Sequence, residues 1–332
     1  MPEQNEWTIS VVVPVYNGGK TIRATIEHLL RQSLPPDEII VVDDGSTDET
    51  SNILKSFGNQ IKTLSKTNGG PASARNAGVR SSMGRLIAFT DSDCLPDESW
   101  LQEMVKGFHS LRIGGVGGMV CGASDGLIGE YVDLHRWMNP QCAADGSVLY
   151  LVTANACFRS DVLFRANLFD ERFAKAGGED TELSVRLRNF GYEFAFVESA
   201  TVRHRHKRTI RDYLKNIANH GEAQFIIERL WPQQTMGGNY RKQIVRSGAG
   251  VGTMLRFYLS YRQQHDRKRA VFFSLLDHLQ YLARIWGYHR GKRNVSSTWL
   301  RNSVTRDPGS VDYRSEHMRV DSILCPKSDA GG

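Results

Sequence analysis

The sequence has few cysteines, and their spacing does not suggest a bridging pattern. Its five cysteines are scattered over 332 residues, and no two form a C-x-x-C pair. An odd number of isolated thiols is typical of a reducing compartment. We therefore expect a protein without a disulfide framework.

The sequence also lacks long apolar runs and internal repeats. No apolar run approaches the roughly 18 residues that cross a bilayer. Residues 1–7 are polar and acidic, without the basic and then apolar pattern of a secretory signal. The apolar fraction of 40% is ordinary for a globular chain. These features predict a cytoplasmic protein.

The first half of the chain alternates short aliphatic runs with amphipathic segments, which predicts an α/β fold. We expect strands at 9–13, 39–42, 61–64 and 86–89. We expect helices to begin near Ile22, at a cap formed by Ser46 or Thr47 with Asp48 and Glu49 in the first turn, at Pro71, and at Pro96. This order indicates a mostly parallel sheet that binds ligands at the carboxyl ends of its strands.

The pattern changes near Gly114. Strand-like segments near Met119 and at 148–153, a helix from Asp180 and a strand at 193–197 predict a small mixed-sheet extension. We divide the chain into a first domain at 1–205, a basic amphipathic helical region at 206–293, and a polar tail at 294–332.

Basic residues gather after residue 202 and account for much of the excess behind the net charge of +6. Residues 250–290 are predicted to form helices with one apolar stripe: Phe272, Leu275, Leu276, Leu279, Leu282 and Trp286. We favour packing of this stripe on the first domain or on a second subunit. Basic amphipathic helices also bind anionic membranes, so peripheral contact with the inner face of the cell membrane is the alternative. The oligomeric state stays open.

Two acidic pairs stand where ligands are expected. Asp91 and Asp93 follow the strand at 86–89, and Asp43 and Asp44 follow the strand at 39–42. Adjacent carboxylates also occur in ordinary turns and caps. Hard oxygen ligands at a sheet edge suit Mg²⁺ or Mn²⁺, which bind substrate phosphates at the same time. One of the earlier pair could accept the imide N–H of a uracil.

A third acidic pair, Glu179 and Asp180, follows Gly177 and Gly178. It could be an N-cap that the helix dipole favours. Two preceding glycines allow a ligand to approach the backbone closely. A carboxylate in this position could act as general base on a hydroxyl.

Five segments together resemble glycosyltransferase family 2, in that family's order. They span roughly residues 8–205 and read PVYN at 14–17, DDGSTD at 43–48, NGGPASARNAG at 68–78, TDSD at 90–93 and GED at 178–180. The resemblance implies the A-type glycosyltransferase fold, which has a Rossmann-like, mostly parallel sheet with a small mixed extension, here followed by a C-terminal helical region. It also implies a nucleotide-sugar donor and inversion at the anomeric carbon.

The resemblance carries roles over to individual residues. It implies Asp180 as the general base, with Glu179 as the alternative, and Asp93 and Asp91 as metal ligands. It implies donor binding by Pro14, Val15, Tyr16, Asn17, Asp43, Asp44, Asn68, Gly70, Arg75, Asn76, Asp91, Ser92, Asn155 and Gly178. His204 is a further candidate metal ligand and His206 the second choice, although a solvated basic face explains this segment equally well.

The expected activity is metal-dependent, inverting transfer of a hexosyl or N-acetylhexosaminyl group. The donor is a nucleotide-diphosphate sugar, with UDP favoured, and the cofactor is Mg²⁺ or Mn²⁺. The acceptor is a hydroxyl of a glycan, a lipid-linked molecule or a small molecule, in cell-surface glycan synthesis. A sugar nucleotidyltransferase is the alternative enzyme. Nucleic-acid binding, which the basic charge would fit, is disfavoured because the predicted cleft is acidic and lacks interleaved aromatics.

Overall fold

A computed structural model describes residues 7–123, 126–206, 209–232 and 251–295. Residues 1–295 form one compact unit, and residues 296–332 are a second. The predicted polar tail lies outside the described residues from residue 296 onward, as do Cys325 and residues 1–6. The predicted boundary after residue 205 stays a prediction.

The core of the protein is an eight-stranded sheet with the order β3-β2-β1-β4-β9-β6-β10-β5. Its strands are β1 (Ile9–Val15), β2 (Glu38–Asp43), β3 (Lys62–Ser65), β4 (Leu86–Thr90), β5 (Cys94–Pro96), β6 (Ile113–Gly122), β9 (Asn155–Arg159) and β10 (Glu193–His204). A short hairpin joins β7 (Gln141–Cys142) to β8 (Val148–Tyr150).

The sheet has a parallel half and a mixed half. Strands β1 to β4 run parallel to one another, whereas β9 pairs antiparallel with both β4 and β6. Strand β10 is parallel to β6 and antiparallel to β5. The strand order reverses between β1 and β4, which is where open α/β sheets bind ligands. The predicted Rossmann-like sheet with a mixed extension is confirmed.

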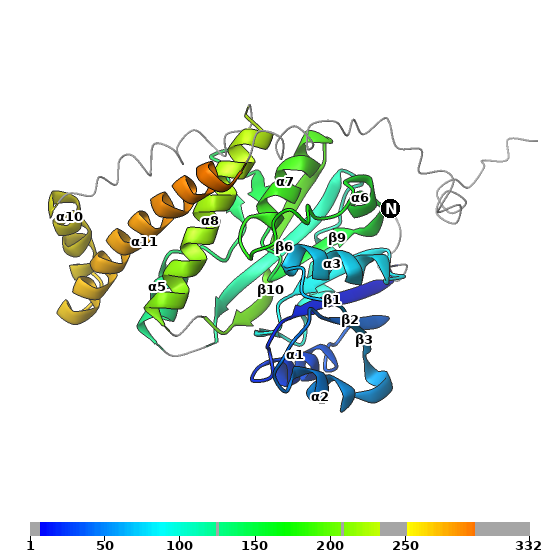
Figure 1. The fold of residues 1–332 in the computed structure, drawn as a ribbon. Coiled ribbons are helices and arrows are strands. Elements are labelled where there is room, and N and C mark those ends of the chain that lie inside the picture. Colours follow the sequence, from blue (N-terminus) through cyan, green and yellow to red (C-terminus); the bar gives the residue numbers. More distant parts are fainter. Residues whose placement is uncertain (1–6, 124–125, 207–208, 233–250, 296–332) are drawn as a thin grey trace, which may run out of the picture. The chain divides into compact units, whose positions relative to one another are not determined.

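Helices cover both faces of the sheet because β1, β2 and β4 are apolar on both sides. One face packs against α1 (Ile22–Leu29), α2 (Thr50–Lys55) and α4 (Trp100–Lys106). The other packs against α3 (Pro71–Arg80), α6 (Ser160–Arg165) and α7 (Glu179–Asn189). Figure 1 shows α3 on one side of β1 and α1 and α2 on the other. A 3-10 turn, η2 (Gly58–Gln60), precedes β3.

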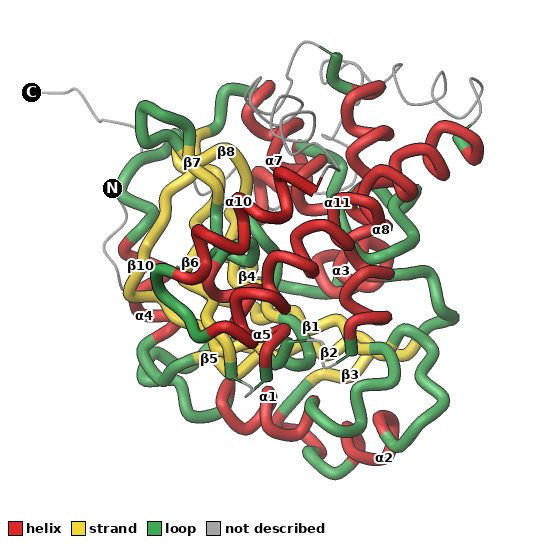
Figure 2. The backbone as a smooth tube through the Cα atoms, turned by 90° about the vertical axis from the view of Figure 1, so that its left-hand side faces the viewer, coloured by secondary structure: helices red, strands yellow, loops and turns green. Residues whose placement is uncertain are grey.

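A third apolar cluster joins the sheet region to the C-terminal helices. It contains side chains of α5 (Leu127–Leu134), α8 (Ile210–Leu230) and α11 (Arg267–Asn294), and α10 (Val251–Arg262) packs at its border. Helices α8 and α11 cross closely (Figures 1 and 2). Gly221 and Gly287 lie at this crossing, and a Cβ on either would overlap the backbone of the opposite helix. The C-terminal helical region is therefore confirmed.

Two predicted helix starts were wrong. The helix expected from Pro96 begins at Trp100, because residues 94–96 form β5 and pair with β10. The helix expected to be capped by Ser46 or Thr47 begins at Thr50. Asp48 therefore precedes the helix and is not in its first turn. Its carboxylate accepts hydrogen bonds from Thr50 N at 3.0 Å and from Gly19 N at 3.0 Å.

The apolar stripe on α11 packs only in part on the first domain, where Leu276 and Phe272 join the cluster that contains α5. Leu275, Leu282 and Trp286 are 44%, 46% and 54% exposed, and Leu276 is the stripe residue that is fully buried. The close crossing with α8 selects another face of the helix, because its glycines allow the shortest approach. Contact of the exposed residues with a membrane or with a second subunit stays a prediction.

Candidate active site

The loops after β1 and β2 are tied together by hydrogen bonds at the carboxyl edge of the sheet. Asn17 has a φ of 51°. Its backbone N–H donates to Ser46 Oγ at 2.9 Å, and its Oδ1 accepts from Thr47 N at 2.8 Å. These bonds hold Tyr16 at the loop tip, 54% exposed. Pro14 and Val15 lie within β1, below this loop.

Asp44 anchors the loop that follows β3. Its carboxylate accepts from Lys66 Nζ at 2.6 Å, Gly69 N at 3.0 Å and Gly70 N at 2.8 Å. The side-chain amide of Asn68 donates to the Asp44 carbonyl at 3.0 Å. Asp44 therefore shapes the loop, and recognition of a base by Asp44 stays a prediction. Asp43 accepts one hydrogen bond from Ser46 N at 2.9 Å.

Arg75 on α3 connects the acidic pair that follows β4 with the acidic pair at the start of α7. Its guanidinium pairs with Asp91 at 2.9 Å and with Glu179 at 2.8 Å, and its side chain is 4% exposed. Arg75 Nε has no hydrogen-bond partner among the described residues. The structure therefore brings the end of β4 and the start of α7 to one place.

Glu179 and Asp180 differ in their surroundings. Glu179 is buried, and its Oε2 also accepts from Gly177 N at 2.9 Å. Asp180 is half-buried and accepts hydrogen bonds from the backbone of Thr181 and Thr153. Burial raises the pKa of both carboxyl groups, against the lowering effect of Arg75. A carboxylate with a raised pKa and an accessible edge can accept a proton.

Gly178 lets α7 begin at this point. Its φ of 105° is left-handed, and a Cβ there would overlap the side chain of Ala223 on α8. A Cβ at Gly177 would lie 3.2 Å from the ring of His220, also on α8. Helix α8 therefore forms one wall beside the acidic pair. His220 itself is solvent-exposed.

Asp93, Cys94 and His204 form a cluster that could hold a metal ion. One potential ligand atom from each lies within 4.8 Å of the others. Asp93 Oδ1 and His204 Nε2 are 3.3 Å apart. Neighbouring ligands of an octahedral ion are about 3.0 Å apart when each is about 2.1 Å from the metal. These two donors therefore fit a divalent cation, whereas burial raises the pKa of the Cys94 thiol and keeps it protonated.

His206 lies beside His204, as alternation along an extended segment predicts. Their Nδ1 atoms are 3.1 Å apart, but His206 Nε2 faces Asp133 Oδ1 at 2.9 Å instead of the cluster. Burial lowers the pKa of His206. Asp91 is also outside the cluster in this arrangement, since its carboxylate pairs with Arg75. Metal binding by Asp91 stays a prediction.

Several predicted donor-binding residues hold the protein together. The Asn155 amide accepts from Trp100 Nε1 at 2.7 Å and donates to the carbonyls of Met119 and Ala200, both at 2.8 Å. The Asn76 amide binds the backbone of Phe169 and the carboxylate of Glu171. The Ser92 carbonyl accepts from Thr25 Oγ1 at 3.0 Å. Donor contacts of these residues stay predictions.

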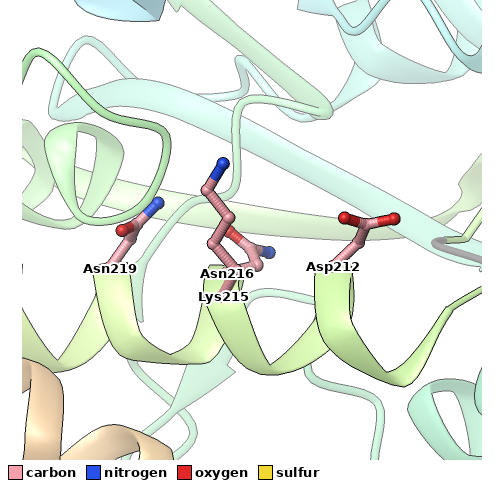
Figure 3. Close-up of a pocket in the computed structure, with 4 residues that line it drawn as sticks. All are labelled: Asp212, Lys215, Asn216 and Asn219. Atoms are coloured by element: carbon pink, nitrogen blue, oxygen red, sulfur yellow. The ribbon is translucent and has the colours of Figure 1, made fainter.

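A pocket of about 370 Å³ lies along α8, lined by Asp212, Lys215, Asn216 and Asn219 (Figure 3). The residues at 212, 216, 219 and 223 share one face of a helix with 3.6 residues per turn. Ala223 on that face contacts the Gly178 turn. The pocket therefore lies along the side of α8 that also contacts the Gly178 turn.

The sequence did not reveal Asp133, His220 or Cys94 as members of this region. Cys94 directly follows the D-x-D sequence, so its position was a usable signal. Asp133 and His220 are polar residues in amphipathic helices, and such residues are ordinarily expected on the solvent-exposed face. Their proximity depends on how α5 and α8 pack, and no local pattern encodes it.

The fold is that of the A-type glycosyltransferases, with a switch point in the sheet order. The site combines a D-x-D sequence after β4 with an acidic pair at a helix start. Solved structures agree on the fold. GalNAc-T7 with UDP, GalNAc and Mn²⁺ superposes with a TM-score of 0.54 and 17% identity, covering 70% of this chain and 49% of that one. Mannosyltransferase PcManGT from Pyrobaculum calidifontis, in complex with GDP-Man and Mn²⁺, gives 0.52 and 17%, covering 88% and 75%.

The sequence pattern of Glycosyl transferase family 2 matches residues 10–171, just under half of this chain. Glycosyltransferase GlyG of Streptococcus pneumoniae is 41% identical over 102 residues, which are 30% of this chain and 34% of GlyG. Glycosyltransferase AglE of Haloferax volcanii is 29% identical over 197 residues, 57% of this chain and 64% of AglE. The chain thus matches about one third to two thirds of the length of these relatives.

A helix that crosses a bilayer must be both long and apolar. None of the helices between residues 7 and 295, outside the gaps given above, meets both conditions.

Proposed function

We propose that this protein transfers a sugar from a nucleotide-diphosphate sugar to an acceptor hydroxyl, with inversion and with the help of a divalent cation. The observation that carries the proposal is the double ion pair of Arg75, which joins Asp91 of the D-x-D sequence to Glu179 beside the candidate base. This double pairing supports the proposal that the candidate metal ligand Asp93, two residues after Asp91, and the candidate base Asp180 serve one substrate.

The carboxyl edge of β1 and β2 is the proposed donor site. Tyr16 presents an exposed ring that could stack on a base. Asp43 uses one oxygen for Ser46 N, so its other oxygen is the better candidate to accept an imide N–H than the three-fold engaged Asp44. We favour UDP as the carrier, and GDP, whose guanine N1–H could donate to the same oxygen, is the competing carrier to test.

Asp93 and His204 would hold the cation, which when bound offsets charge on the departing diphosphate. The titles of the two neighbouring structures name Mn²⁺ together with UDP or GDP-Man, which supports a divalent ion here. Mg²⁺ and Mn²⁺ both suit one carboxylate with substrate phosphates, while the imidazole of His204 favours Mn²⁺.

Asp180 is the proposed base. The pKa of both carboxyl groups is raised, but Glu179 already accepts hydrogen bonds from Arg75 and Gly177 N, whereas Asp180 is more accessible. It would take the proton from the acceptor hydroxyl as the hydroxyl oxygen attacks the anomeric carbon from the face opposite the diphosphate. One base and a stabilised leaving group suffice for inversion, so no second nucleophilic carboxylate is required.

The acceptor would approach along α8. The pocket lined by amides, one acid and one lysine suits a hydroxyl-rich molecule. This lining supports the polar part of a glycan, a lipid-linked sugar or a small molecule as the acceptor. Synthesis of cell-surface glycans is the process we infer.

A panel of nucleotide sugars, with Mg²⁺ or Mn²⁺ and without acceptor, tests the donor through slow hydrolysis to nucleoside diphosphate. Release of pyrophosphate instead would indicate a nucleotidyltransferase and contradict the proposal.

Asp180→Asn tests the base. We expect it to keep donor affinity within about twofold and to slow transfer by roughly 10²–10⁴, as measured by donor titration and initial rates. Asp93→Ala should weaken donor binding in Mn²⁺ and change it little in EDTA. Transfer by Asp180→Asn at the unmodified rate would show that another group is the base.

A further inference from the structure

Four side chains form an unbroken row from the predicted cation site to helix α5. Asp93 Oδ1 lies 3.3 Å from His204 Nε2, the two histidine Nδ1 atoms are 3.1 Å apart, and His206 Nε2 lies 2.9 Å from Asp133 Oδ1. Both histidines are buried, at 7% and 6% exposure. The row therefore has three gaps between atoms that can each accept a hydrogen bond.

Two neutral imidazoles supply only two N–H groups for these three gaps. One gap must then hold two facing lone pairs, which repel each other unless a cation lies between them. The gap between the two Nδ1 atoms, at 3.1 Å, is within hydrogen-bond length and is the least suited of the three to a cation, because no carboxylate borders it, so the gap without a proton is one of the other two. If that gap were the one beside Asp133, His206 Nε2 and a carboxylate oxygen would face each other at 2.9 Å without a proton. If it is the one beside Asp93, the repulsion falls at the predicted metal ligands.

The distances favour the second arrangement. A separation of 2.9 Å is the usual length of an N–H···O hydrogen bond, whereas 3.3 Å is longer than usual. In this arrangement His206 Nε2–H donates to Asp133, and His204 Nδ1–H donates to His206 Nδ1. The lone pair of His204 Nε2 then points toward Asp93, as a metal ligand requires.

We propose that Asp133 and His206 are positioning residues that fix His204 in the tautomer able to bind the donor-associated cation. This inference rests on the proposed metal-dependent transfer. Neither residue touches the cation: Asp133 acts on His206, and His206 acts on His204. The family resemblance implies no role for Asp133, and the sequence predicted His206 only as the second choice of metal ligand.

The surroundings of Asp133 keep its carboxylate in place. Helix α5 carries Asp133 on one side, and on another side its Tyr131 hydroxyl donates to Asp277 of α11. At the end of β6, a Cβ on Gly122 would overlap Asp133 Oδ2. The lack of a side chain at Gly122 therefore leaves the space that the carboxylate occupies.

Two variants of the full chain change the row without touching a ligand. Asp133→Asn keeps the shape but can present either an acceptor or a donor to His206, so it releases the tautomer. Gly122→Ala keeps every polar group and pushes aside the flexible end of Asp133. Asp97→Asn is the matched control, because this acid is 44% exposed and pairs only loosely with Arg203 at 3.4 Å.

The first measurement is the tautomer itself, by long-range ¹H–¹⁵N NMR of metal-free protein at a pH well above the ordinary histidine pKa. We expect protonated Nδ1 on His204 and protonated Nε2 on His206. Protonated Nε2 on His204 would overturn the inference, whatever the variants do.

The second measurement is Mn²⁺ affinity by calorimetry, with UDP present and with thermal unfolding as a check of the fold. We expect Asp133→Asn and Gly122→Ala each to raise the Mn²⁺ dissociation constant by roughly 10-fold or more, and Asp97→Asn to leave it unchanged. The double variant should be little worse than Asp133→Asn alone, because both changes act on the same contact.

The outcomes separate this inference from the proposed function. Unchanged Mn²⁺ affinity in folded Asp133→Asn overturns the positioning role while leaving metal-dependent transfer intact. Absence of Mn²⁺ binding in the unmodified chain overturns the metal dependence, and the NMR result then decides by itself whether the proton order in the row is correct.

Discussion

Arg75 has a larger electrostatic role in the site than its place in a sequence motif suggests. It neutralises two carboxylates from segments that are 16 and 104 residues away in the chain. A buried cation between two acids is costly to remove, because both acids lose their partner in a poorly solvated place. The same cation opposes the effect of burial on the pKa of Asp180.

We therefore expect Arg75→Met to lower the free energy of unfolding by about 3–5 kcal/mol, measured by denaturant titration. Arg80→Met is the control on the same helix, because its pair with Glu171 is 3.5 Å long and both side chains are about half exposed. That change should cost at most about 1 kcal/mol. Equal losses in the two variants would contradict the central role of Arg75.

The pH dependence of transfer follows from the raised pKa of Asp180. A base acts in its ionised form, so the rate should rise with pH through a pKa above the ordinary value of 3.8. Initial rates at saturating donor and acceptor measure this rise, which Asp180→Asn should abolish. A rate that is already flat just above pH 4 would contradict it.

The stability change has the opposite sign. A raised pKa means that the folded state binds the proton more tightly than the unfolded state. The contribution of Glu179 and Asp180 to stability is therefore fully present below their ordinary values of 4.5 and 3.8, and it declines as pH rises through the raised values.

At the residue scale, the sequence predicted what its local patterns encode. Asp91 and Asp93 were found because a buried apolar strand ends just before them. The pairing of His206 with Asp133 was not found, because it joins residues 73 apart through the packing of α5 beside β10. The internal roles of Asn76 and Asn155 were also invisible, since an amide that binds a ligand and one that binds a backbone look the same in sequence.

Among the elements, the turn before α3 shows how backbone shape places a functional side chain. Gly70 has a φ of 86°, and a Cβ there would overlap the carbonyl of Ala174. Its N–H donates to Asp44, and α3 begins at the next residue. The turn thus sets the start of the helix that presents Arg75.

Gly70→Ala should lower the free energy of unfolding by at least about 3 kcal/mol, from backbone strain and the overlap together. Gly58→Ala is the matched change, because Gly58 has a φ of 53° but open space around the missing Cβ. It should cost about 1–2 kcal/mol. Denaturant titration of both variants checks the difference, and similar costs would show that contact with Ala174 is unimportant.

The elements themselves were predictable where apolar periodicity was strong. Strands β1, β2 and β4 and helix α1 lie where expected. The errors fell where tertiary contacts overrode local signals: β5 replaced the expected start of α4 by pairing with β10, and the buried face of α11 was chosen by glycines that allow a close crossing. Apolar patterns alone predict that the stripe with the larger side chains is buried, and not the face that carries the glycines.

For the whole molecule, the fold class could be predicted because strands and helices alternate in a recognisable order. The relation of the C-terminal helices to the sheet could not, because the contacts are long-range. Ile128, Tyr131 and Val132 of α5 pack in one cluster with Tyr213 of α8 and Phe273 of α11.

A chain that ends at residue 206 should therefore lose stability, because the buried face of α5 would meet water. We expect a lower midpoint of thermal unfolding and faster hydrogen exchange in α5 than in a chain ending at residue 295, which keeps the first compact unit. Equal protection of α5 in both chains would contradict this.

The short helix α5 is held in place by polar contacts with the C-terminal helices. Its Tyr131 hydroxyl meets Asp277, its Glu130 pairs with Arg269 at 3.0 Å, and the residue that follows its end, His135, meets Tyr261 at 3.0 Å. A chimaera that joins residues 1–206 to the helices of another protein would leave the buried Tyr131 hydroxyl without its partner and would lose the other two contacts. The sheet region and the C-terminal helices can therefore be exchanged between chains of this fold only when the cut keeps α5 with its own C-terminal partners.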